Sequence, residues 1–330
     1  MFLLFRAARR YMYSSSLSWP APTSLVGFIL GCFSLCIINW FFPAPFPFFC
    51  VLSFVGLIVV FLSLLFFLSY VVLPRAVSYL SFCANSGRDL DPDGYRLNLI
   101  IAFCLGGVFF FGILLDIHAF KELSTPRIVW PFGTYLTLLA FFHWSEFFFA
   151  ALTSPSRADT DLYLLNHSPE YLCALTLSFT EYWLEVFFWP AKTTFLALNF
   201  IGLSICLAGE VARKAAMLTA AGNFSHYVEH TRRRDHRLVR NGVYAWCRHP
   251  AYAGWFVWSL GTQLLLVNPL CSVMYPIAAY HFFRDRVYSE ELSLVAFFGD
   301  GYRAYQREVP TGLPFIYGYV DNDVIRANTH

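Results

Sequence analysis

A short polar cluster near the C-terminus carries the side chains of a binding site. Residues 245–256 read AWCRHPAYAGWF, in which Arg248 and His249 precede Pro250, and Tyr252 follows. Arginine and histidine supply hydrogen-bond donors, and a tyrosine ring can stabilise a cation. An apolar run that ends in TQLLLVNPLC comes next. We therefore expect chemistry at this cluster, at the boundary between water and an apolar phase.

A second charged segment, RDRVYSEE at residues 284–291, follows the next apolar run. Arg286 and Glu290 are four residues apart and share one face if the segment is helical. Such a pair is either a surface salt bridge, worth about 0–1 kcal/mol, or part of a site that handles both an anion and a cation. Its position beside an apolar span, where charge is costly, favours the site.

Familiar catalytic motifs are missing from the sequence. There is no P-loop, HExxH or GxSxG pattern. Residues 299–304, GDGYRA, fit GxGxxA but do not follow a strand, so we discount a Rossmann site. The nine cysteines include no CxxC pair, and we expect neither disulfides nor a metal site. No basic face interleaved with aromatic residues indicates a nucleic-acid partner.

Composition places both clusters in a membrane protein. Hydrophobic residues make up 58% of the 330 and charged residues 13%, about half the charged share of a soluble domain. We predict an all-α polytopic membrane protein with eight transmembrane helices. The predicted spans are 25–42, 48–73, 97–115, 128–151, 170–189, 192–211, 253–267 and 270–283.

The last two predicted spans differ from the first six. They break at Asn268-Pro269, and each is shorter than the roughly 20 residues that cross a bilayer unaided, so we expect a short helical hairpin. Residues 1–211 would form a transmembrane scaffold. Residues 212–330 would form a cytosolic, cofactor-binding catalytic region that includes the hairpin at 253–283.

Basic residues set the predicted orientation. With a cytosolic N-terminus, only Lys121, Arg127 and Lys192 of the 23 Lys and Arg residues fall on the far side. This asymmetry predicts that both termini are cytosolic. The segment 1–13 is too short and basic to span, and it lacks a convincing signal-peptide cleavage site. The sequons at Asn166 and Asn223 would then face the cytosol, and we interpret them as unused.

Four ionisable residues fall inside predicted spans: His143, Glu146, Glu181 and Glu185. Buried ionisable groups in a membrane need partners. Interhelical hydrogen bonds are favoured here over substrate contacts.

Longer segments carry a resemblance to a known family. HRLVRNGVYAWCRHPAYAGWF, then NPLC, then FFRDRVYSEELSLVAFFGDGYRAYQREVPTGLPF, with RKAAMLTAAGNFSHYV upstream, resemble the eukaryotic isoprenylcysteine carboxyl methyltransferases. The resemblance covers roughly residues 130–318. It implies methylation, by S-adenosyl-L-methionine, of the C-terminal prenylcysteine carboxylate of CaaX proteins such as small GTPases. It also implies an endoplasmic reticulum membrane location with a cytosolic site.

The resemblance implies roles for particular residues. Arg286 would meet the substrate carboxylate and act in catalysis. At the position of Glu229, members of the family can carry Gln. The implied cofactor-binding residues are Glu229, His236, Arg237, Leu238, Val239, Tyr244, His249, Pro250, Ala251, Tyr252 and Glu290.

Three other interpretations remain open from the residues. A methyltransferase for phospholipid amines would use the same donor, but its acceptor is neutral or cationic, and Arg286 argues against it. A sterol reductase would need donors for the 2′-phosphate of NADPH, which the run Arg232-Arg233-Arg234 can supply. That run also fits a solvated, positive cytosolic loop. A channel or transporter would place its polar residues at the midplane, and here they gather at one end.

Overall fold

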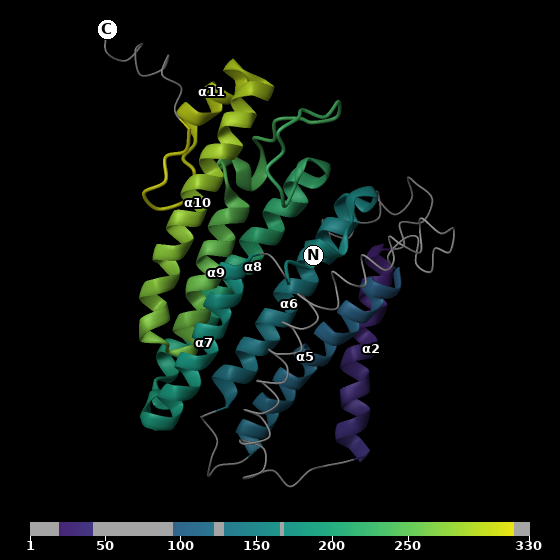
Figure 1. The fold of residues 1–330 in the computed structure, drawn as a ribbon, viewed down its shortest axis with the longest axis vertical. Coiled ribbons are helices and arrows are strands. Elements are labelled where there is room, and N and C mark those ends of the chain that lie inside the picture. The colour runs from purple at the N-terminus through teal and green to yellow at the C-terminus, as the bar shows by residue number, and fades with distance from the viewer. Residues whose placement is uncertain (1–19, 42–94, 122–128, 166–167, 320–330) are drawn as a thin grey trace. The chain divides into compact units, whose positions relative to one another are not determined.

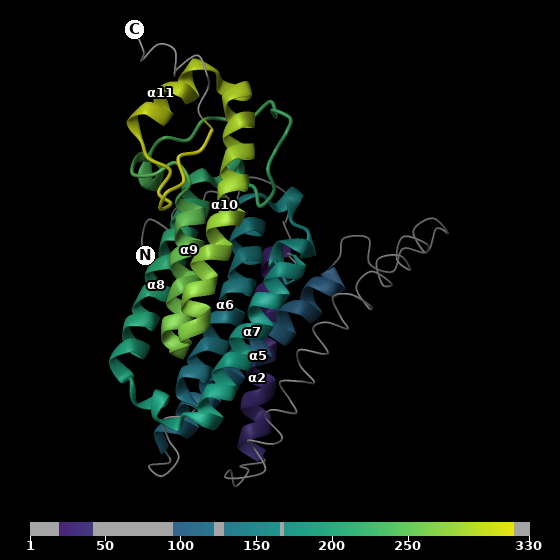
Figure 2. The same cartoon turned by 60° about the vertical axis from the view of Figure 1, so that its left-hand side comes forward.

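The computed structural model describes residues 20–41, 95–121, 129–165 and 168–319. Within these ranges the chain is helical and contains no strand, which confirms the all-α prediction. The chain divides into two compact units, Met1–Phe179 and Thr180–His330. Figure 1 and Figure 2 show the helices from two directions. The α-helices are α2 (Pro20–Phe41), α5 (Tyr95–Lys121), α6 (Trp130–Thr153), α7 (Pro169–Phe188), α8 (Leu196–Ala220), α9 (Pro250–Leu266), α10 (Pro269–Phe298) and α11 (Asp300–Glu308).

Short 3-10 helices connect these elements. They are η2 (Pro155–Arg157), η3 (Thr160–Tyr163), η4 (Pro190–Thr194), η5 (Ala221–Asn223) and η6 (Gly242–Ala245). The predicted division of roles at residue 211 differs from the boundary between the compact units, and it stays a prediction.

Membrane character follows from the helices themselves. Among the described residues, four helices are long and apolar enough to cross a bilayer, over Pro20–Ile37, Leu97–Ala119, Trp130–Thr153 and Leu196–Asn223. The remaining predicted spans inside the described ranges also coincide with helices. The span at 48–73, the segment 1–13 and the sequon at Asn166 lie outside the described residues. A total of eight crossings therefore stays a prediction.

In the first unit, polar groups inside the helices pair with one another. Nδ1 of His143 donates to the carbonyl oxygen of Tyr163 at 2.8 Å, and the hydroxyl of Tyr171 lies 2.8 Å from Nε2. The Tyr163 hydroxyl in turn lies 2.8 Å from Oγ of Ser24. Glu146 is fully buried on the same helix as His143. These bonds agree with the structural interpretation of His143.

In the second unit, glycines let α8 and α9 come close together. A Cβ atom on Gly209 would lie 2.5 Å from the backbone nitrogen of Trp258, and one on Gly254 would lie 2.7 Å from that of Arg213. Small residues at such positions allow backbone approach in apolar helix pairs. A guanidinium nitrogen of Arg213 also donates to the carbonyl oxygen of Ala251 at 3.0 Å. The first turn of α9 is thereby anchored to α8.

The start of α10, at the turn of the hairpin, is held by Glu181, one of two acidic residues that the sequence places within the span 170–189. The Glu181 carboxylate accepts hydrogen bonds from the backbone nitrogens of Leu270 and Cys271, at 2.6 and 2.8 Å. It therefore caps donors that a helix start leaves unpaired. Glu185 pairs at 2.5 Å with Lys192. Both carboxylates thus have structural partners.

Helix α10 corrects the prediction of a short hairpin. The predicted break at Asn268-Pro269 is confirmed, but α10 continues through Pro276 to Phe298 instead of ending near residue 283. Helical hydrogen bonds do not require an apolar sequence, and the charged segment after residue 283 contains no glycine or proline before Gly299. The helix ends at Gly299, which has a φ of 56°. As a result, Arg286 and Glu290 lie one turn apart on one rigid element.

Candidate active site

One cavity in the second unit gathers residues from four parts of the chain. It is open to solvent, and the empty space in it and at its mouth amounts to about 850 Å³. Its walls come from the end of α8, the loop that follows it, the start of α9, and α10 with α11. The first helical turn of α9 begins at Pro250, where proline is well tolerated because the missing N–H would have no partner there. This start directs His249, Ala251 and Tyr252 to the cavity.

The loop between α8 and α9 is fixed by polar contacts at both ends. The backbone nitrogen of Arg237 donates to Oδ1 of Asn223 at 2.8 Å. Nε of Arg233 pairs with Glu229 at 2.8 Å. Farther along, the hydroxyl of Tyr305 donates to the carbonyl oxygen of Tyr244 at 2.5 Å. The loop therefore presents a defined wall to the cavity.

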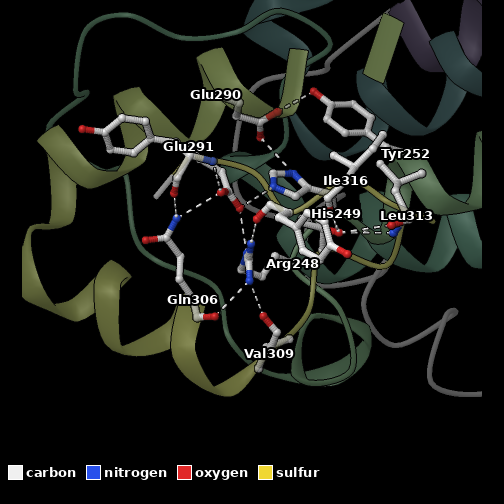
Figure 3. Close-up of polar contacts among 12 residues, drawn as sticks. Arg248, His249, Tyr252, Glu290, Glu291, Gln306, Val309, Leu313 and Ile316 are labelled. Atoms are coloured by element: carbon white, nitrogen blue, oxygen red, sulfur yellow. Dashed lines mark hydrogen bonds and ion pairs between the residues drawn. The ribbon is translucent and has the colours of Figure 1, made fainter. Parts of the chain in front are cut away.

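Beside His249 lies a fully buried carboxylate, that of Glu291 (Figure 3). Nε of Arg248 donates to it at 2.7 Å and Nε2 of His249 at 3.0 Å. Its other partners are the hydroxyl of Tyr302 at 3.1 Å, Nε2 of Gln306 at 3.0 Å and the backbone nitrogen of Tyr319 at 2.9 Å. Because a carboxylate only accepts, His249 must carry its proton on Nε2. Nδ1 is therefore the ring nitrogen of His249 that remains to pair with a ligand in the cavity.

The charge of Glu291 is stabilised by these partners. Burial acts to raise its pKa, but the hydrogen bond from His249 and the charge of Arg248 lower it from the ordinary value of 4.5 to about 2. Glu291 is therefore ionised throughout the physiological range.

Arg248 also holds the segment that follows α11. Its guanidinium donates to the carbonyl oxygens of Gln306 and Tyr317, each at 3.0 Å, and to that of Val309. The backbone nitrogens of Arg248 and His249 donate to the carbonyl oxygens of Pro310 and Thr311, at 2.8 and 3.1 Å. The last described residues are thus hydrogen-bonded to Arg248 and His249, which line the cavity.

Along the cavity edge, Tyr252 links two charged side chains. Its hydroxyl donates to Oε2 of Glu290 at 2.5 Å and accepts from Nε of Arg286 at 2.9 Å. The Tyr252 ring stacks on the His249 ring, with centroids 5.5 Å apart and planes inclined by 5°. Arg286 additionally donates to the carbonyl oxygen of His226. Arg286 does not line the cavity, but it lies one hydrogen bond away from residues that do.

At the far end, His236 presents an unpaired polar atom. Its Nδ1 is buried and has no hydrogen-bond partner among the described residues. The rings of Phe297 and Phe298 lie 5.6 and 5.2 Å from the imidazole ring. Burial lowers the pKa of His236, and Arg233 and Arg232 lower it further against the opposing effect of Glu229. The imidazole is therefore neutral at pH 7 and can pair with a ligand.

Two of the three arginines in the basic run of the loop make contacts within the fold. A guanidinium nitrogen of Arg232 donates to the carbonyl oxygen of Phe297 at 2.6 Å, and the group lies 4.9 Å from the centre of the Phe298 ring. Arg233 pairs with Glu229 and with the carbonyl oxygen of Gly222. These contacts weaken the argument that the run binds the 2′-phosphate of NADPH.

The structure brings together all the cofactor-binding residues that the sequence predicts. Each of Glu229, His236, Arg237, Leu238, Val239, Tyr244, His249, Pro250, Ala251, Tyr252 and Glu290 lines the one cavity. Their roles stay predictions. Sequence reasoning did not identify Glu291, Gln306 or Tyr302, although the adjacent acidic pair Glu290-Glu291 was a visible signal. It named Arg248 as a hydrogen-bond donor of the cluster at 245–256 but did not predict that Arg248 pairs with Glu291.

Known proteins of one family are similar to this chain. Residues 200–296 match the isoprenylcysteine carboxyl methyltransferase (ICMT) family. The chain is 46% identical over 210 residues to the protein-S-isoprenylcysteine O-methyltransferase of Tribolium castaneum, covering 64% of this chain and 75% of that protein. For the human protein of the same name the identity is 45% over 227 residues, with 69% and 77% covered.

A solved structure is similar as well. It is described as the eukaryotic intramembrane Ras methyltransferase ICMT without a monobody. The match has a TM-score of 0.71 and 36% sequence identity, and it covers 92% of this chain and all of that one. With relatives this similar over most of their length, the chain belongs to the isoprenylcysteine carboxyl methyltransferase family.

Proposed function

We propose that this chain is an enzyme that methylates the C-terminal carboxylate of prenylated cysteine, with S-adenosyl-L-methionine as the methyl donor. Membership of the family supports a membrane methyltransferase and a prenylcysteine acceptor. The observation that carries the assignment of the site is the cavity itself. All eleven predicted cofactor-binding residues, which come from separate segments, line it, and Arg286 lies one hydrogen bond from its edge.

The cavity suits the chemical groups of the donor. The donor carries a sulfonium cation, an amino group and a carboxylate on an adenosine body. Glu290 offers negative charge, and the Tyr252 ring offers an aromatic face for a cation. The unpaired Nδ1 of His236, whose ring lies beside two phenylalanine rings, suits a polar edge of a flat ring system. These residues would hold the donor, which supplies an electrophilic methyl group.

The acceptor carboxylate needs no general base. An α-carboxyl group has a pKa of about 3.3–3.7 and is ionised at pH 7. What the protein must supply is alignment and exclusion of water. Arg286 has five N–H donors, and its contacts with Tyr252 and His226 use two of them. The remaining donors can orient one carboxylate oxygen and leave the other to react.

We propose that Tyr252 couples the two ends of this reaction site. Its hydroxyl touches both the arginine that would meet the acceptor and the glutamate that would meet the donor. A single hydroxyl thereby sets the spacing between an anion site and a cation site.

The proposal extends to the setting of the enzyme. We place the site at the cytosolic face of the endoplasmic reticulum membrane, with prenylated CaaX proteins such as small GTPases as substrates. A prenyl chain dissolves in the bilayer while the carboxylate and the cofactor remain in water. Helix α10, which runs from an apolar start to the charged segment containing Arg286, suits an acceptor with these two parts.

The test compares two neighbouring arginines on α10. Arg286→Ala should lower kcat/KM for methyl-ester formation from N-acetyl-S-farnesylcysteine by about 100-fold, the equivalent of one charge-assisted pair at roughly 3 kcal/mol. Arg286→Lys should recover part of it, because lysine keeps the charge without the planar fork. The measurement is transfer of radiolabelled methyl groups by purified protein in detergent-lipid micelles.

The matched control is Arg284→Ala, which removes an exposed arginine paired with Asp285 and should change kcat/KM by less than about threefold. Equal losses in both variants would contradict the role of Arg286. If wild type forms no ester but turns over NADPH or methylates a phospholipid amine, the proposed reaction is wrong.

A further inference from the structure

The segment after α11 has one buried and one exposed face. We call residues 310–319 the C-terminal strap. Leu313 and Ile316 are buried in one cluster with Ala279, Phe283 and Val287 of α10. Between and beyond them, Phe315 is 81% exposed and Tyr317 is 79% exposed. The strap is thus firmly attached to α10 while it turns two aromatic rings outward.

Phe315 adopts a backbone conformation that is unusual for a bulky residue. Its φ is 59°, in the left-handed region that L-residues rarely enter. The neighbouring Leu313 and Ile316 remain inward on either side of it. The strained turn therefore has the effect of projecting the ring away from the protein.

The outward rings lie next to an exposed apolar stripe of α10. Leu270, Val273, Met274 and Ile277 are all exposed, and their spacing of three and four residues puts them on one face of the helix. The next members of that face are Tyr280 and Arg284. One groove is lined by Tyr280, Arg284, Phe315 and Tyr317 together. The rings of the strap therefore meet the helix where its apolar stripe gives way to charge.

Basic side chains surround the same rings. Arg303 and Arg307 of α11 line a groove on the other side of the strap, which Phe315 and Tyr317 also line. Aromatic rings beside arginines at the end of an apolar helix face are typical of the membrane–water interface. There the rings lie at the headgroup level and the guanidinium groups meet lipid phosphates.

We propose that the strap is seated in the bilayer interface. Phe315 enters the boundary between headgroups and acyl chains, Tyr317 lies at headgroup level, and Arg307 contacts lipid phosphates. The strap is hydrogen-bonded to Arg248 and His249. Contact between the strap and the bilayer therefore also supports two residues that line the cavity. The inference rests on membrane insertion of the chain and not on the proposed reaction.

The test places a photoreactive residue on the strap. p-Benzoylphenylalanine replaces Phe315, and in a second variant Tyr317, in full-length protein in nanodiscs that contain radiolabelled phospholipid. The control replaces Asp300, a fully exposed residue at the start of α11. It comes just after Phe298, the last residue of α10, which lies about 21 Å of helix rise beyond Arg284. Both strap positions tolerate a larger ring because they are exposed.

The expected result is a lipid cross-link at least about five times stronger at 315 and 317 than at 300. Equal yields at the strap and at residue 300, no lipid product at the strap, or cross-linking only to a second protein chain would overturn the proposal. Methyl transfer plays no part in this readout, so a failure here is distinct from a failure of the proposed reaction.

Discussion

The hydroxyl of Tyr252 is the smallest group on which the proposed site depends. Replacing it by Tyr252→Phe keeps the ring stacked on His249 but removes the contacts to Glu290 and Arg286. Hydrogen bonds to charged groups contribute about 1.5–3 kcal/mol, so we expect kcat/KM to fall by about 10- to 100-fold. Steady-state methyl transfer checks this result.

Tyr288→Phe provides the comparison, because Tyr288 is half-exposed on α10 and does not line the cavity. Its activity should match wild type. A Tyr252→Phe variant with unchanged kcat and KM would show that the hydroxyl does not organise the site.

The buried Glu291 carboxylate predicts a particular pH dependence of stability. Its folded pKa of about 2 lies below the ordinary value of 4.5, so the ionised form is favoured in the fold. This contribution is fully present above pH 4.5 and is lost as the pH falls toward 2. Glu291→Gln breaks a buried pair, which should cost about 3–5 kcal/mol at pH 7.

Thermal unfolding of wild type and Glu291→Gln from pH 7 down to pH 2.5 measures this effect. The gap between the two midpoints should narrow below pH 4.5, as the wild-type carboxyl becomes protonated. Other carboxylates titrate in both proteins and cancel in the difference. A gap that is independent of pH would mean that Glu291 does not bear the charge assigned to it.

At the scale of elements, the close pairing of α8 and α9 positions the start of α9. Gly254→Ala would bring a Cβ within 2.7 Å of the backbone of α8, where no side chain can move aside. We expect a loss of stability of about 1–3 kcal/mol from this overpacking, together with weaker cofactor binding. The thermal midpoint and the dissociation constant of S-adenosylmethionine are the quantities to measure.

Gly301→Ala is the matched control for that substitution. Gly301 lies in α11, and a Cβ there would meet nothing within 4 Å. Alanine should leave stability unchanged or raise it by up to about 1 kcal/mol, because it favours a helix over glycine. If both variants behave alike, the α8–α9 contact is looser than described.

At the scale of the whole molecule, the distribution of basic residues predicts which side of the membrane the site faces. Sealed endoplasmic reticulum vesicles with their cytosolic face outward should methylate a prenylcysteine substrate when S-adenosylmethionine is added outside. A charged cofactor does not cross the bilayer readily. Detergent should therefore raise the rate less than about twofold, as measured by methyl-ester formation. Activity that appears only after permeabilisation would reverse the predicted orientation.

The sequence by itself determined the class of the molecule and much of its local structure. Long apolar runs indicate membrane helices because a bilayer requires length and low charge. Pro269 separates the two helices of the hairpin, because proline cannot continue the preceding helix. The lining residues were predicted through family resemblance. Among them, His249, Pro250 and Tyr252 belong to one short motif, so their closeness follows from the sequence alone.

Only the tertiary structure decided the contacts that join distant segments. Arg248 and Glu291 are 43 residues apart, and neither residue type reveals that the other is its partner. The sequence also did not predict that α10 continues past the apolar span, because composition marks the membrane boundary and not the end of hydrogen bonding. The hydrogen bonds from Arg248 and His249 to the strap likewise join residues far apart in the sequence. A buried ion pair and its backbone contacts depend on where helices cross, which is settled only when the side chains of the whole unit pack.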